Sequence, residues 1–348
     1  MPKIIIFTKY AELGASSRMR FYQYLYNIDR EILTFPLFEN EYLRQIYSGN
    51  NGKLIALKNY ARRMKKLILC DFKNSTIVIE KELFPYIPYF IERIFLLRFK
   101  SYILDYDDAT FHTYDNHNNL IIKLLLKNKI SKLMYRAEKV VCGNEYLAAY
   151  ANLYNKKVQV VPTVVDCSRL HRRKKLPNKK LLVGWIGTPK TQKYLEPVYD
   201  VVAKLSNEFQ IQLVAVGAKG FKPQTNFYRE VVWVEDCENE IINSFDVGVM
   251  PLIDEPFERG KCGFKLLQYM AVGLPVIASS VGVNSKIIDH EINGFLAFNN
   301  ADWELLINNF MHLTQSEKFE LGSAGRLKIE NNYNLHTWKL LFDKQIYG

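Results

Sequence analysis

Short apolar runs alternate with helical amphipathic patterns along most of the chain. The runs at 3–8, 75–80, 101–106 and 139–144 are apolar without alternation, as strands covered by helices on both faces must be. Each is followed by a segment with helical spacing, and the third by a helix expected over about 117–137. This rhythm predicts an open parallel α/β sheet for the first half of the chain.

The rhythm breaks at 158–180, where Pro162, Pro177 and the basic residues between them predict a linker. A second alternating series follows, with strands expected at 180–187, 211–217, 231–235, 246–252, 274–280 and 294–298. We therefore predict an α/β protein with two Rossmann-like, doubly wound parallel-sheet domains, 1–165 and 166–330, facing a central cleft. Residues 331–348 are expected to form a C-terminal helix, and a crossing back to the first domain is one option for it.

Composition adds three limits. Apolar residues make up 48% and charged residues 24% of the 348, as in an ordinary soluble globular protein. No run reaches the ~18 apolar residues of a membrane-spanning helix, and the N-terminus lacks a signal-peptide pattern, so we expect a cytoplasmic protein. The five cysteines show neither metal-type pairs nor a disulfide framework, and we expect reduced thiols and no metal site.

The net charge of +11 is concentrated in the first half, where residues 1–165 hold 25 basic and 15 acidic residues. This asymmetry predicts an anionic partner. Two helical patterns with apolar flanks carry much of the charge and suit an anionic bilayer surface. No nucleic-acid-reading motif accompanies them, so nucleic acid is not expected as a partner. The cations are Lys58, Arg62, Arg63, Lys65, Lys66, Lys123, Lys127 and Lys132.

The segment GKCGFKLLQYMAVGLPVIAS, residues 260–279, is typical of an anion-binding helix entrance. Gly260 and Gly263 allow close approach of a ligand to the backbone, and the helix start presents unpaired N–H groups and a positive dipole. Lys261 and Lys265 add positive charge. Spacing predicts a buried stripe at Phe264, Leu267 and Ala271, with Gln268 on the accessible side, and Gly273 ending the helix. A plain helix–turn–strand unit with exposed lysines is the alternative.

The same segment resembles the signature of glycosyltransferase family 4, in which a glutamate, seven residues and a second glutamate precede an MA-x-G-x-P-V-I-A run. The resemblance extends over nearly the whole chain, through GASSRMRFYQYL, YDDATF, CGNEYLAAYA, VQVVPTVVD, VGWIGTP and VGVNSKIIDHEINGFLA in the expected order. It implies a GT-B fold, a nucleotide-sugar held mainly by the second domain, retention of the anomeric configuration, and no cofactor or metal.

The chain departs from the family signature at both glutamates. Gly260 stands at the first position and Gln268 at the second. A glutamine carbonyl can still accept hydrogen bonds from the ribose hydroxyls that the second glutamate binds. Glycine cannot replace the first glutamate, which touches the donor sugar, and Glu258 or Asp254 are the nearby substitutes. The sequence therefore does not identify the sugar that is transferred.

The resemblance also assigns the loop of residues 11–20 to the donor diphosphate. Gly14 is expected to allow a tight turn, and Ser16 or Ser17 to cap the following helix. Arg18 is the residue expected to reach the diphosphate. For Arg20 a contact with the acceptor and an exposed helix position are equal alternatives.

In the second domain the resemblance places the nucleotide at three strand ends. Gly187 and Thr188 are expected to line the phosphate site, with Lys190 as a displaced cation. The family arginine is missing there, which leaves Lys261 and Lys265 as the expected source of positive charge. The remaining donor residues are Gly263 and Phe264 at the helix entrance and Gly217, Trp233 and Val234 near the base.

Acidic residues follow two strands of the first domain. Asp107 aligns with a catalytic histidine of the family and is expected under the transferred sugar, stabilising positive charge on the anomeric carbon. A helix N-cap is the alternative for Asp108. Glu82 follows the other strand and is a candidate for acceptor contact, with a solvated turn as the alternative.

Together these features predict a retaining, metal-independent glycosyltransferase. It would move a sugar from a nucleotide donor, which the family resemblance implies is UDP-linked, to a glycan or lipid-linked acceptor. The expected setting is surface polysaccharide or lipopolysaccharide synthesis at the inner face of the cytoplasmic membrane. A sugar-nucleotide epimerase of GT-B type and a catalytically inactive relative that binds nucleotide or glycan are the alternatives.

Overall fold

The computed structural model describes residues 3–25, 31–47, 52–170, 179–234 and 237–342. By internal contacts it divides into two compact units. The first contains residues up to Thr163, Arg259–Cys262 and the segment that begins at Trp338, and the second contains Val164–Glu258 and Gly263–Thr337. The signature segment of the sequence is therefore divided between the two units.

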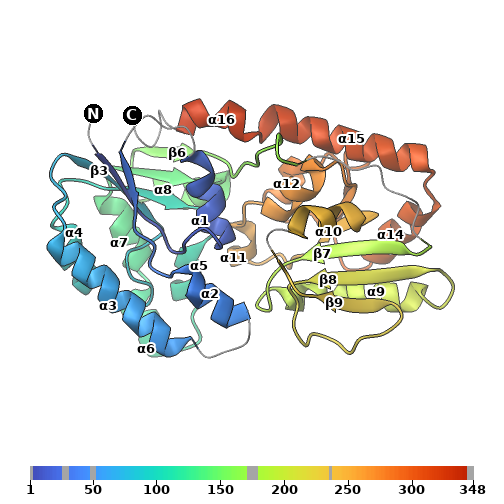
Figure 1. Ribbon diagram of the computed structural model, residues 1–348, viewed down its shortest axis with the longest axis horizontal. Helices are drawn as coiled ribbons and strands as arrows, with labels where there is room; N and C mark the ends of the chain where they lie inside the picture. The colour runs from blue at the N-terminus through green and yellow to red at the C-terminus, as the bar shows by residue number, and fades with distance from the viewer. Residues whose placement is uncertain (1–2, 26–30, 48–51, 171–178, 235–236, 343–348) are drawn as a thin grey trace. The chain divides into compact units, whose positions relative to one another are not determined.

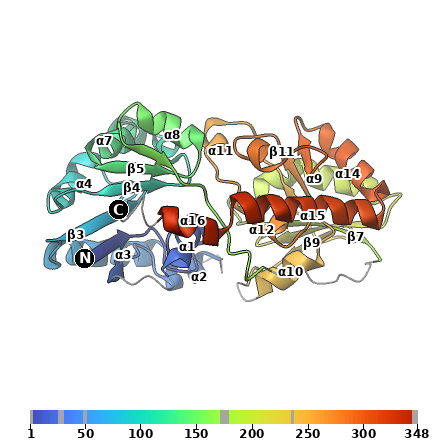
Figure 2. The same cartoon turned by 90° about the horizontal axis from the view of Figure 1, so that it is seen from above.

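The first unit is a parallel six-stranded sheet in the order β2-β1-β3-β4-β5-β6. Helices lie on both faces of the sheet (Figure 1, Figure 2). Its elements are β1 (Lys3–Phe7), α1 (Ala15–Arg20), η1 (Tyr22–Tyr24), β2 (Ile32–Thr34), α2 (Asn40–Tyr47), α3 (Lys53–Leu69), β3 (Ser75–Glu80), α4 (Tyr89–Leu96), β4 (Ile103–Tyr106), α5 (Thr110–Asp115), α6 (Leu120–Leu126), α7 (Lys129–Arg136), β5 (Lys139–Cys142), α8 (Glu145–Asn152) and β6 (Val158–Val160).

The second unit repeats this architecture with the order β12-β11-β10-β7-β8-β9, again all parallel. Its elements are β7 (Leu181–Ile186), η2 (Gln192–Leu195), α9 (Glu196–Leu205), β8 (Ile211–Val216), β9 (Tyr228–Val231), α10 (Glu238–Ser244), β10 (Val247–Met250), α11 (Pro256–Arg259), α12 (Phe264–Ala271), β11 (Val276–Ser279), α13 (Asn284–Ile287), β12 (Phe295–Ala297), α14 (Asp302–His312), α15 (Gln315–Asn332) and α16 (Leu335–Phe342), the last of which passes into the first unit at Trp338.

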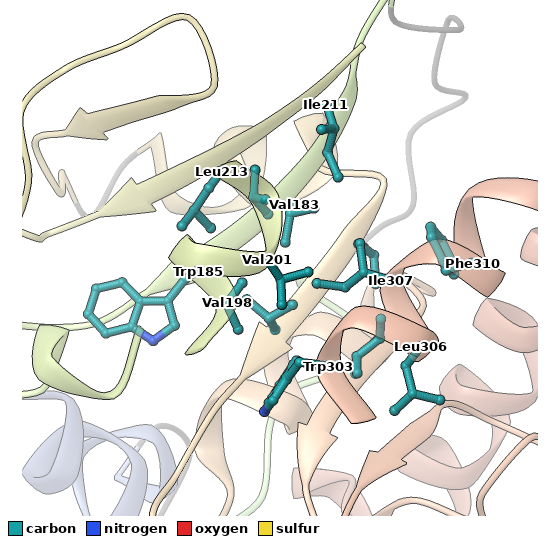
Figure 3. Close-up of a cluster of buried hydrophobic side chains, with 14 of the residues drawn as sticks. Val183, Trp185, Val198, Val201, Ile211, Leu213, Trp303, Leu306, Ile307 and Phe310 are labelled. Carbon is teal, nitrogen blue, oxygen red and sulfur yellow. The ribbon is translucent and has the colours of Figure 1, made fainter. Parts of the chain in front are cut away.

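Two hydrophobic clusters pack against the second sheet. One joins β7 and β8 to α9 and α14, with Val183 and Leu213 facing Val198 and Ile307 (Figure 3). The other joins the sheet to α12, whose residues Leu266 to Ala271 are all buried. Non-alternating apolar strands are what a sheet covered on both faces requires.

The predicted fold class is correct, and the main differences concern element boundaries. The helix expected over 117–137 is two helices, α6 and α7: the Asn119 side chain caps the start of α6, and Asn128 occupies the N-cap position of α7. The expected linker begins with a strand, β6, and its residues 171–178 lie outside the described residues. The strand expected at 231–235 ends at Val231, and α16 begins at Leu335 and is described to Phe342.

Candidate functional site

The strand order of the first sheet reverses between β1 and β3. In open parallel sheets, ligands bind outside the carboxyl ends of the strands at such a reversal. The carboxyl ends of β1, β3 and β4 and the segments that follow them meet at this edge and supply Ser16, Glu80, Lys81, Asp107 and Asp108. We call these five residues the carboxyl-edge cluster.

Lys81 is the centre of the carboxyl-edge cluster. Its Nζ lies 2.7 Å from Asp107 Oδ1 and 3.1 Å from Asp108 Oδ2, and Ser16 Oγ donates to Asp107 Oδ2 at 2.5 Å. Lys81 has a backbone φ of 63°, a conformation that residues with a Cβ rarely adopt. Residues in such strained conformations are common at functional sites. Asp108 therefore pairs with Lys81, and the predicted N-cap role is wrong, because α5 is preceded by Ala109 and has no side-chain cap.

Charge in the cluster follows from these contacts. Burial alone would lower the pKa of Lys81, but Asp107 and Asp108 outweigh burial and raise that pKa well above its ordinary value. Burial alone would raise the pKa of Asp107, but Lys81 and the Ser16 hydrogen bond hold it below the ordinary value. The Lys81 ammonium and the Asp107 carboxylate are therefore both charged at neutral pH.

Glu80 ties the first loop to β3. Its Oε2 accepts hydrogen bonds from Ser17 Oγ at 2.6 Å and from the Lys9 backbone N–H at 2.7 Å, and its Oε1 accepts from Ser16 Oγ at 3.1 Å. Both serines are thus bound to carboxylates, and neither caps α1, which starts after Gly14 without a side-chain cap. The capping prediction for Ser16 and Ser17 is wrong because α1 begins at Ala15, so both serines lie inside the helix, where their hydroxyls donate to carboxylates.

Arg20 is a structural residue in this arrangement. Its side chain is 1% exposed and forms a two-pronged ion pair with Asp105, with Nε to Oδ1 at 2.9 Å and Nη2 to Oδ2 at 2.5 Å. Its Nη1 donates to the Val161 carbonyl at 2.7 Å. The predicted acceptor contact and the exposed alternative are both contradicted by this burial. Arg18, two residues earlier, is half-buried, and nothing in the structure tests its predicted contact with a diphosphate.

Glu82 is also buried rather than available to an acceptor. Lys129 Nζ lies 2.5 Å from Glu82 Oε2 and 2.8 Å from Glu92 Oε2, and the Tyr114 hydroxyl donates to Glu82 Oε1 at 2.7 Å. The predicted acceptor contact and the solvated turn are both contradicted. Two carboxylates and one ammonium instead fasten α4 and α7 to the end of β3.

Residues 259–262 belong to the first unit. Asn144 Nδ2 donates to the carbonyls of Gly260 and Lys261 at 2.9 and 3.2 Å, and the Cys262 thiol donates to the Asp107 carbonyl at 3.1 Å. A Cβ at Gly260 would lie 2.8 Å from the Ala109 backbone nitrogen. Close packing therefore accounts for Gly260, which was expected to admit a ligand, while Lys261 is half-exposed beside it.

The second sheet reverses its order between β7 and β10. The loops after β7 and β8 touch here, because Gly187 N–H donates to the Val216 carbonyl at 2.9 Å and a Cβ at Gly217 would lie 2.3 Å from the Gly187 oxygen. Gly217 has φ +77° and can be replaced by no other residue without strain. Thr188 and Thr191 close the first loop through their hydroxyls.

Helix α12 begins beside this edge. Gly263 precedes it with φ +67°, and the Lys265 ammonium lies 5.1 Å from the centre of the Trp185 ring, which also fills the space beside Gly187. The Tyr269 hydroxyl accepts the Ile186 backbone N–H at 2.8 Å and so fixes the helix to β7. The structure thus brings Lys265 and Gly187 to one edge.

The structure tests three features that the sequence predicted for α12. Gln268 is 6% exposed, which contradicts its expected place on the accessible side, because the buried surface of α12 runs from Leu266 to Ala271 without a break. Phe264 is only partly buried, against the second cluster. Gly273 follows the helix with φ +72°, as predicted for a C-terminal glycine.

Glu258 is a buried acid near the same edge. It comes from α11, is 4% exposed, and its Oε1 accepts a short hydrogen bond from the hydroxyl of Tyr194 in η2. Its Oε2 is buried and has no hydrogen-bond partner among the described residues. A buried carboxylate oxygen without a partner is costly unless a ligand supplies one.

The remaining predicted donor residues lie outside regular strands. Trp233 is half-buried, with its indole N–H donating to Glu238 Oε1 at 3.0 Å, and Val234 is exposed. Lys190 is exposed in the loop after β7. The structure neither supports nor excludes their contact with a base or phosphate.

The sequence prediction included neither Lys81 nor Tyr194. Lys81 stands between Glu80 and Glu82 at the end of a strand, and its left-handed backbone and its two aspartate partners have no sequence signal. Tyr194 sits in a segment whose pattern resembles any amphipathic helix start. Within the described part of the chain, no three His, Cys, Asp or Glu side chains converge as a metal site, and metal independence stays a prediction.

Comparison with known proteins gives two kinds of similarity. Residues 180–316, less than half of the chain, match the family described as Glycosyl transferases group 1. An uncharacterized glycosyltransferase of Methanocaldococcus jannaschii is 29% identical over 128 residues, which are 34% of this chain and 32% of that protein. The glycosyltransferase TuaH of Bacillus subtilis, assigned provisionally by name to teichuronic acid biosynthesis, is 21% identical over 213 residues. That match spans 53% of this chain and 52% of TuaH.

Solved structures resemble the whole chain. HepE of Anabaena, crystallised with UDP-glucose, has a TM-score of 0.70 at 14% identity, covering 100% of both chains. The curated relatives are matched over only about a third to a half of their own length. The chain therefore has the α/β fold of the GT-B glycosyltransferases, with two Rossmann-like units, and its second half is similar to the group 1 glycosyltransferases.

Proposed function

We propose that the protein is a retaining, metal-independent glycosyltransferase that moves a sugar from a nucleotide-sugar, with UDP as the expected nucleotide, to a hydroxyl of a glycan or lipid-linked acceptor. The observation that carries the proposal is the edge of the second sheet, where Gly187, Gly217 and Lys265 gather at the strand-order reversal within the region matched by the group 1 glycosyltransferases.

Donor binding follows from the chemistry of that edge. Close packing against Trp185 and against the Gly187 oxygen accounts for Gly187 and Gly217, and it holds the loops after β7 and β8 together at this edge. The start of α12 presents N–H groups next to the Lys265 ammonium. These groups complement a pyrophosphate, whose negative charge grows when the nucleoside diphosphate leaves. HepE was crystallised with UDP-glucose, which supports a UDP-linked donor.

Glu258 is proposed to bind the donor sugar in place of the carboxylate that is missing at Gly260. Its unpartnered Oε2 would accept hydrogen bonds from sugar hydroxyls, while the Tyr194 hydroxyl holds Oε1. Asp107 is proposed to stabilise positive charge on the anomeric carbon, since Lys81 and Ser16 keep it anionic.

The proposed setting is surface polysaccharide or lipopolysaccharide synthesis at the inner face of the cytoplasmic membrane. The provisional naming of TuaH for teichuronic acid biosynthesis supports a surface polymer. The membrane association proposed here is peripheral. Among the described residues, no helix combines the length and apolar character needed to cross a bilayer.

Calorimetric titration with UDP, GDP and ADP tests donor binding first. We expect UDP to bind the wild type and the Lys265→Ala variant to bind UDP about tenfold to a hundredfold more weakly, as for a lost charge-assisted hydrogen bond. Lys204→Ala, which removes an exposed lysine paired with Glu304, is the matched control. Equal UDP affinity of the wild type and Lys265→Ala would contradict the donor site.

Turnover then separates the enzyme from its alternatives. Incubation with each nucleotide-sugar and a mixed glycan acceptor should release nucleoside diphosphate, and Glu258→Gln should reduce this rate while UDP affinity is kept. Glu255→Gln, at an exposed position just before α11, controls for general damage. A new nucleotide-sugar formed without acceptor would identify an epimerase, and binding without turnover by the wild type would identify an inactive relative.

A further inference from the structure

Helices α4 and α6 of the first unit expose large apolar side chains. On α4, Phe90, Ile94 and the following Leu97 recur at spacings of four and three, so they form one stripe, and they are 66%, 63% and 72% exposed. The seven residues of α6 include six apolar ones, and four of them face solvent: Leu120, Ile121, Leu124 and Leu125. Exposed apolar surface on this scale marks an interaction site.

The charges among these side chains are of one sign. Helices α4, α6 and α7 contain a single acidic residue, Glu92, which is fully buried against Lys129. The exposed charges are cations: Arg93, Lys123 and Lys132 on these helices and Arg136 at the end of α7. The three helices are contiguous, because α7 packs against both α4 and α6. We call their exposed surface the α4–α6–α7 face.

A pocket of about 530 Å³ opens on this face between α4 and α7. Three cations and three tyrosines line it, together with Asn128 and Ser131: Arg93, Lys132, Arg136, Tyr89, Tyr135 and Tyr154. None of the three cations is ion-paired to a carboxylate within the described residues, and Lys132 Nζ lies 5.8 Å above the Tyr89 ring. The row of Tyr89 and Arg93 on α4 runs directly beside the apolar stripe that begins at Phe90.

We propose that the α4–α6–α7 face docks the protein on an anionic phospholipid bilayer. The apolar side chains of α4 and α6 would enter the boundary between head groups and acyl chains, and the pocket would bind the phosphate of one lipid head group. Charge complementarity favours an anionic bilayer as the partner, because the exposed charges that α4, α6 and α7 place among the apolar residues are all cations. Protein–protein interfaces are depleted of lysine, whereas Lys123 and Lys132 are exposed on this face.

One sequence-based expectation is corrected by this placement. Arg63 of α3 was expected among the basic surface residues, but it is 2% exposed and donates to the carbonyls of Thr8, Phe35 and Leu83. It therefore contributes nothing to a membrane surface. Lys58 and Lys65 of the same helix, and Lys127 after α6, are exposed as expected.

This inference specifies the membrane association proposed above and needs no donor or acceptor, so its failure would leave the sugar-transfer proposal standing. Flotation of the full chain with phosphatidylcholine vesicles, with and without one third phosphatidylglycerol, measures it. We expect at least tenfold stronger binding to the anionic vesicles, decreasing with added salt. Equal binding to both kinds of vesicle would overturn the proposal.

Variants locate the contact. The triple variant Arg93→Gln, Lys132→Gln, Arg136→Gln should bind anionic vesicles at least tenfold more weakly. The control triple Lys204→Gln, Lys222→Gln, Lys328→Gln removes the same charge from the second unit and should stay within twofold of the wild type. If both triple variants weakened vesicle binding equally, the assignment of the contact to the α4–α6–α7 face would be wrong.

Two further experiments test whether the apolar side chains enter the bilayer and whether the pocket binds a lipid head group or a free phosphate ester. In Phe90→Trp, tryptophan emission should shift to the blue on anionic vesicles, whereas Phe319→Trp, at an exposed position of α15, should not shift beyond the wild type. Glycerol 3-phosphate serves as the soluble probe of the pocket. If it binds in an Arg93-dependent way while vesicle binding is unchanged in the first triple variant, the pocket serves a free phosphate ester and the lipid proposal is wrong.

Discussion

At the scale of single residues, Lys81 and Asp107 determine the charge of the carboxyl-edge cluster. Each is held in its charged form by the other, with Asp108 and Ser16 adding to the effect. Removing one member of a buried ion pair leaves the other uncompensated, which costs about 3–5 kcal/mol in measured cases. The cluster therefore links the stability of the first unit to pH.

Asp107→Asn is predicted to lower the free energy of unfolding by about 2–4 kcal/mol at neutral pH, somewhat less than a full buried pair because Asp108 still faces Lys81. Asp107 has a folded-state pKa below its ordinary 3.8, so the folded protein binds fewer protons than the unfolded chain in acid. Its contribution is complete above that ordinary value and is lost as pH falls through the folded pKa. Lys81 has a raised pKa, so its contribution is complete below 10.5 and is lost above the folded pKa.

Urea unfolding of the wild type and Asp107→Asn as a function of pH measures this difference. It should be constant from about pH 5 to about pH 9 and shrink below about pH 4. Asp71→Asn, at an exposed carboxylate whose Oδ1 accepts the Lys73 backbone N–H, should show neither the loss nor the pH dependence. A difference that persists unchanged to about pH 3 would show that Asp107 acts through packing alone.

The residue scale is also where sequence reasoning was weakest. Arg20, Arg63, Glu82 and Gln268 were placed on accessible surfaces, and all four are buried. On α3 the buried row is Asn59, Arg63 and Leu67, so polar residues occupy the very stripe that hydrophobic spacing would assign to the core. A buried charge needs partners from distant segments, and a single sequence does not contain that pairing.

At the scale of elements, α12 shows how one glycine sets the start of a helix. Gly263 has φ +67°, and a Cβ there would lie 2.5 Å from Ile287 Cδ1 and 3.1 Å from Val283 Cγ2. Both neighbours belong to the α13 region, which packs against α12. Gly263 thus allows both the left-handed backbone at the start of α12 and the close contact with α13.

Gly263→Ala and Gly220→Ala separate these two effects. Gly220 has φ +62° and open space around its Cβ position, so alanine there should cost only the backbone strain, about 1 kcal/mol. Gly263→Ala should cost a further 1–3 kcal/mol, roughly the penalty of overpacking a tight site. Chemical denaturation measures both variants. Equal losses would mean that Ile287 moves aside freely and that the contact does not fix α12.

Elements were predicted better than residues because their signals are local. Among the described strands, ten overlap a run that was expected to form a strand. Strand β2, three residues long, had no counterpart, and β6 lies at the start of the segment that was expected to be a linker. Gly273 and Pro275 marked the end of α12 correctly, since their backbone restrictions act without distant partners. The assignment of residues 259–262 to the first unit depends on Asn144, more than a hundred residues away, and had no such signal.

At the scale of the whole molecule, each unit has its own sheet and its own strand-order reversal. The donor site proposed here lies on the second unit alone, so nucleotide should stabilise that unit directly. A ligand at a hundred times its Kd adds about 2.7 kcal/mol to the state that binds it. Amide exchange reports such stabilisation segment by segment.

Hydrogen exchange with and without UDP is therefore predicted to show the strongest protection at 187–191 and 263–268. The Lys265→Ala variant should show less protection there at a UDP concentration near the wild-type Kd. Strand β3 of the first unit should keep its exchange rate. Residues 13–18 decide a separate question, because protection there would support the predicted contact of Arg18 with the diphosphate, and an unchanged rate would remove Arg18 from the site. Protection confined to the first unit would contradict the donor assignment, because the groups that complement a pyrophosphate at Gly187 and Lys265 all belong to the second.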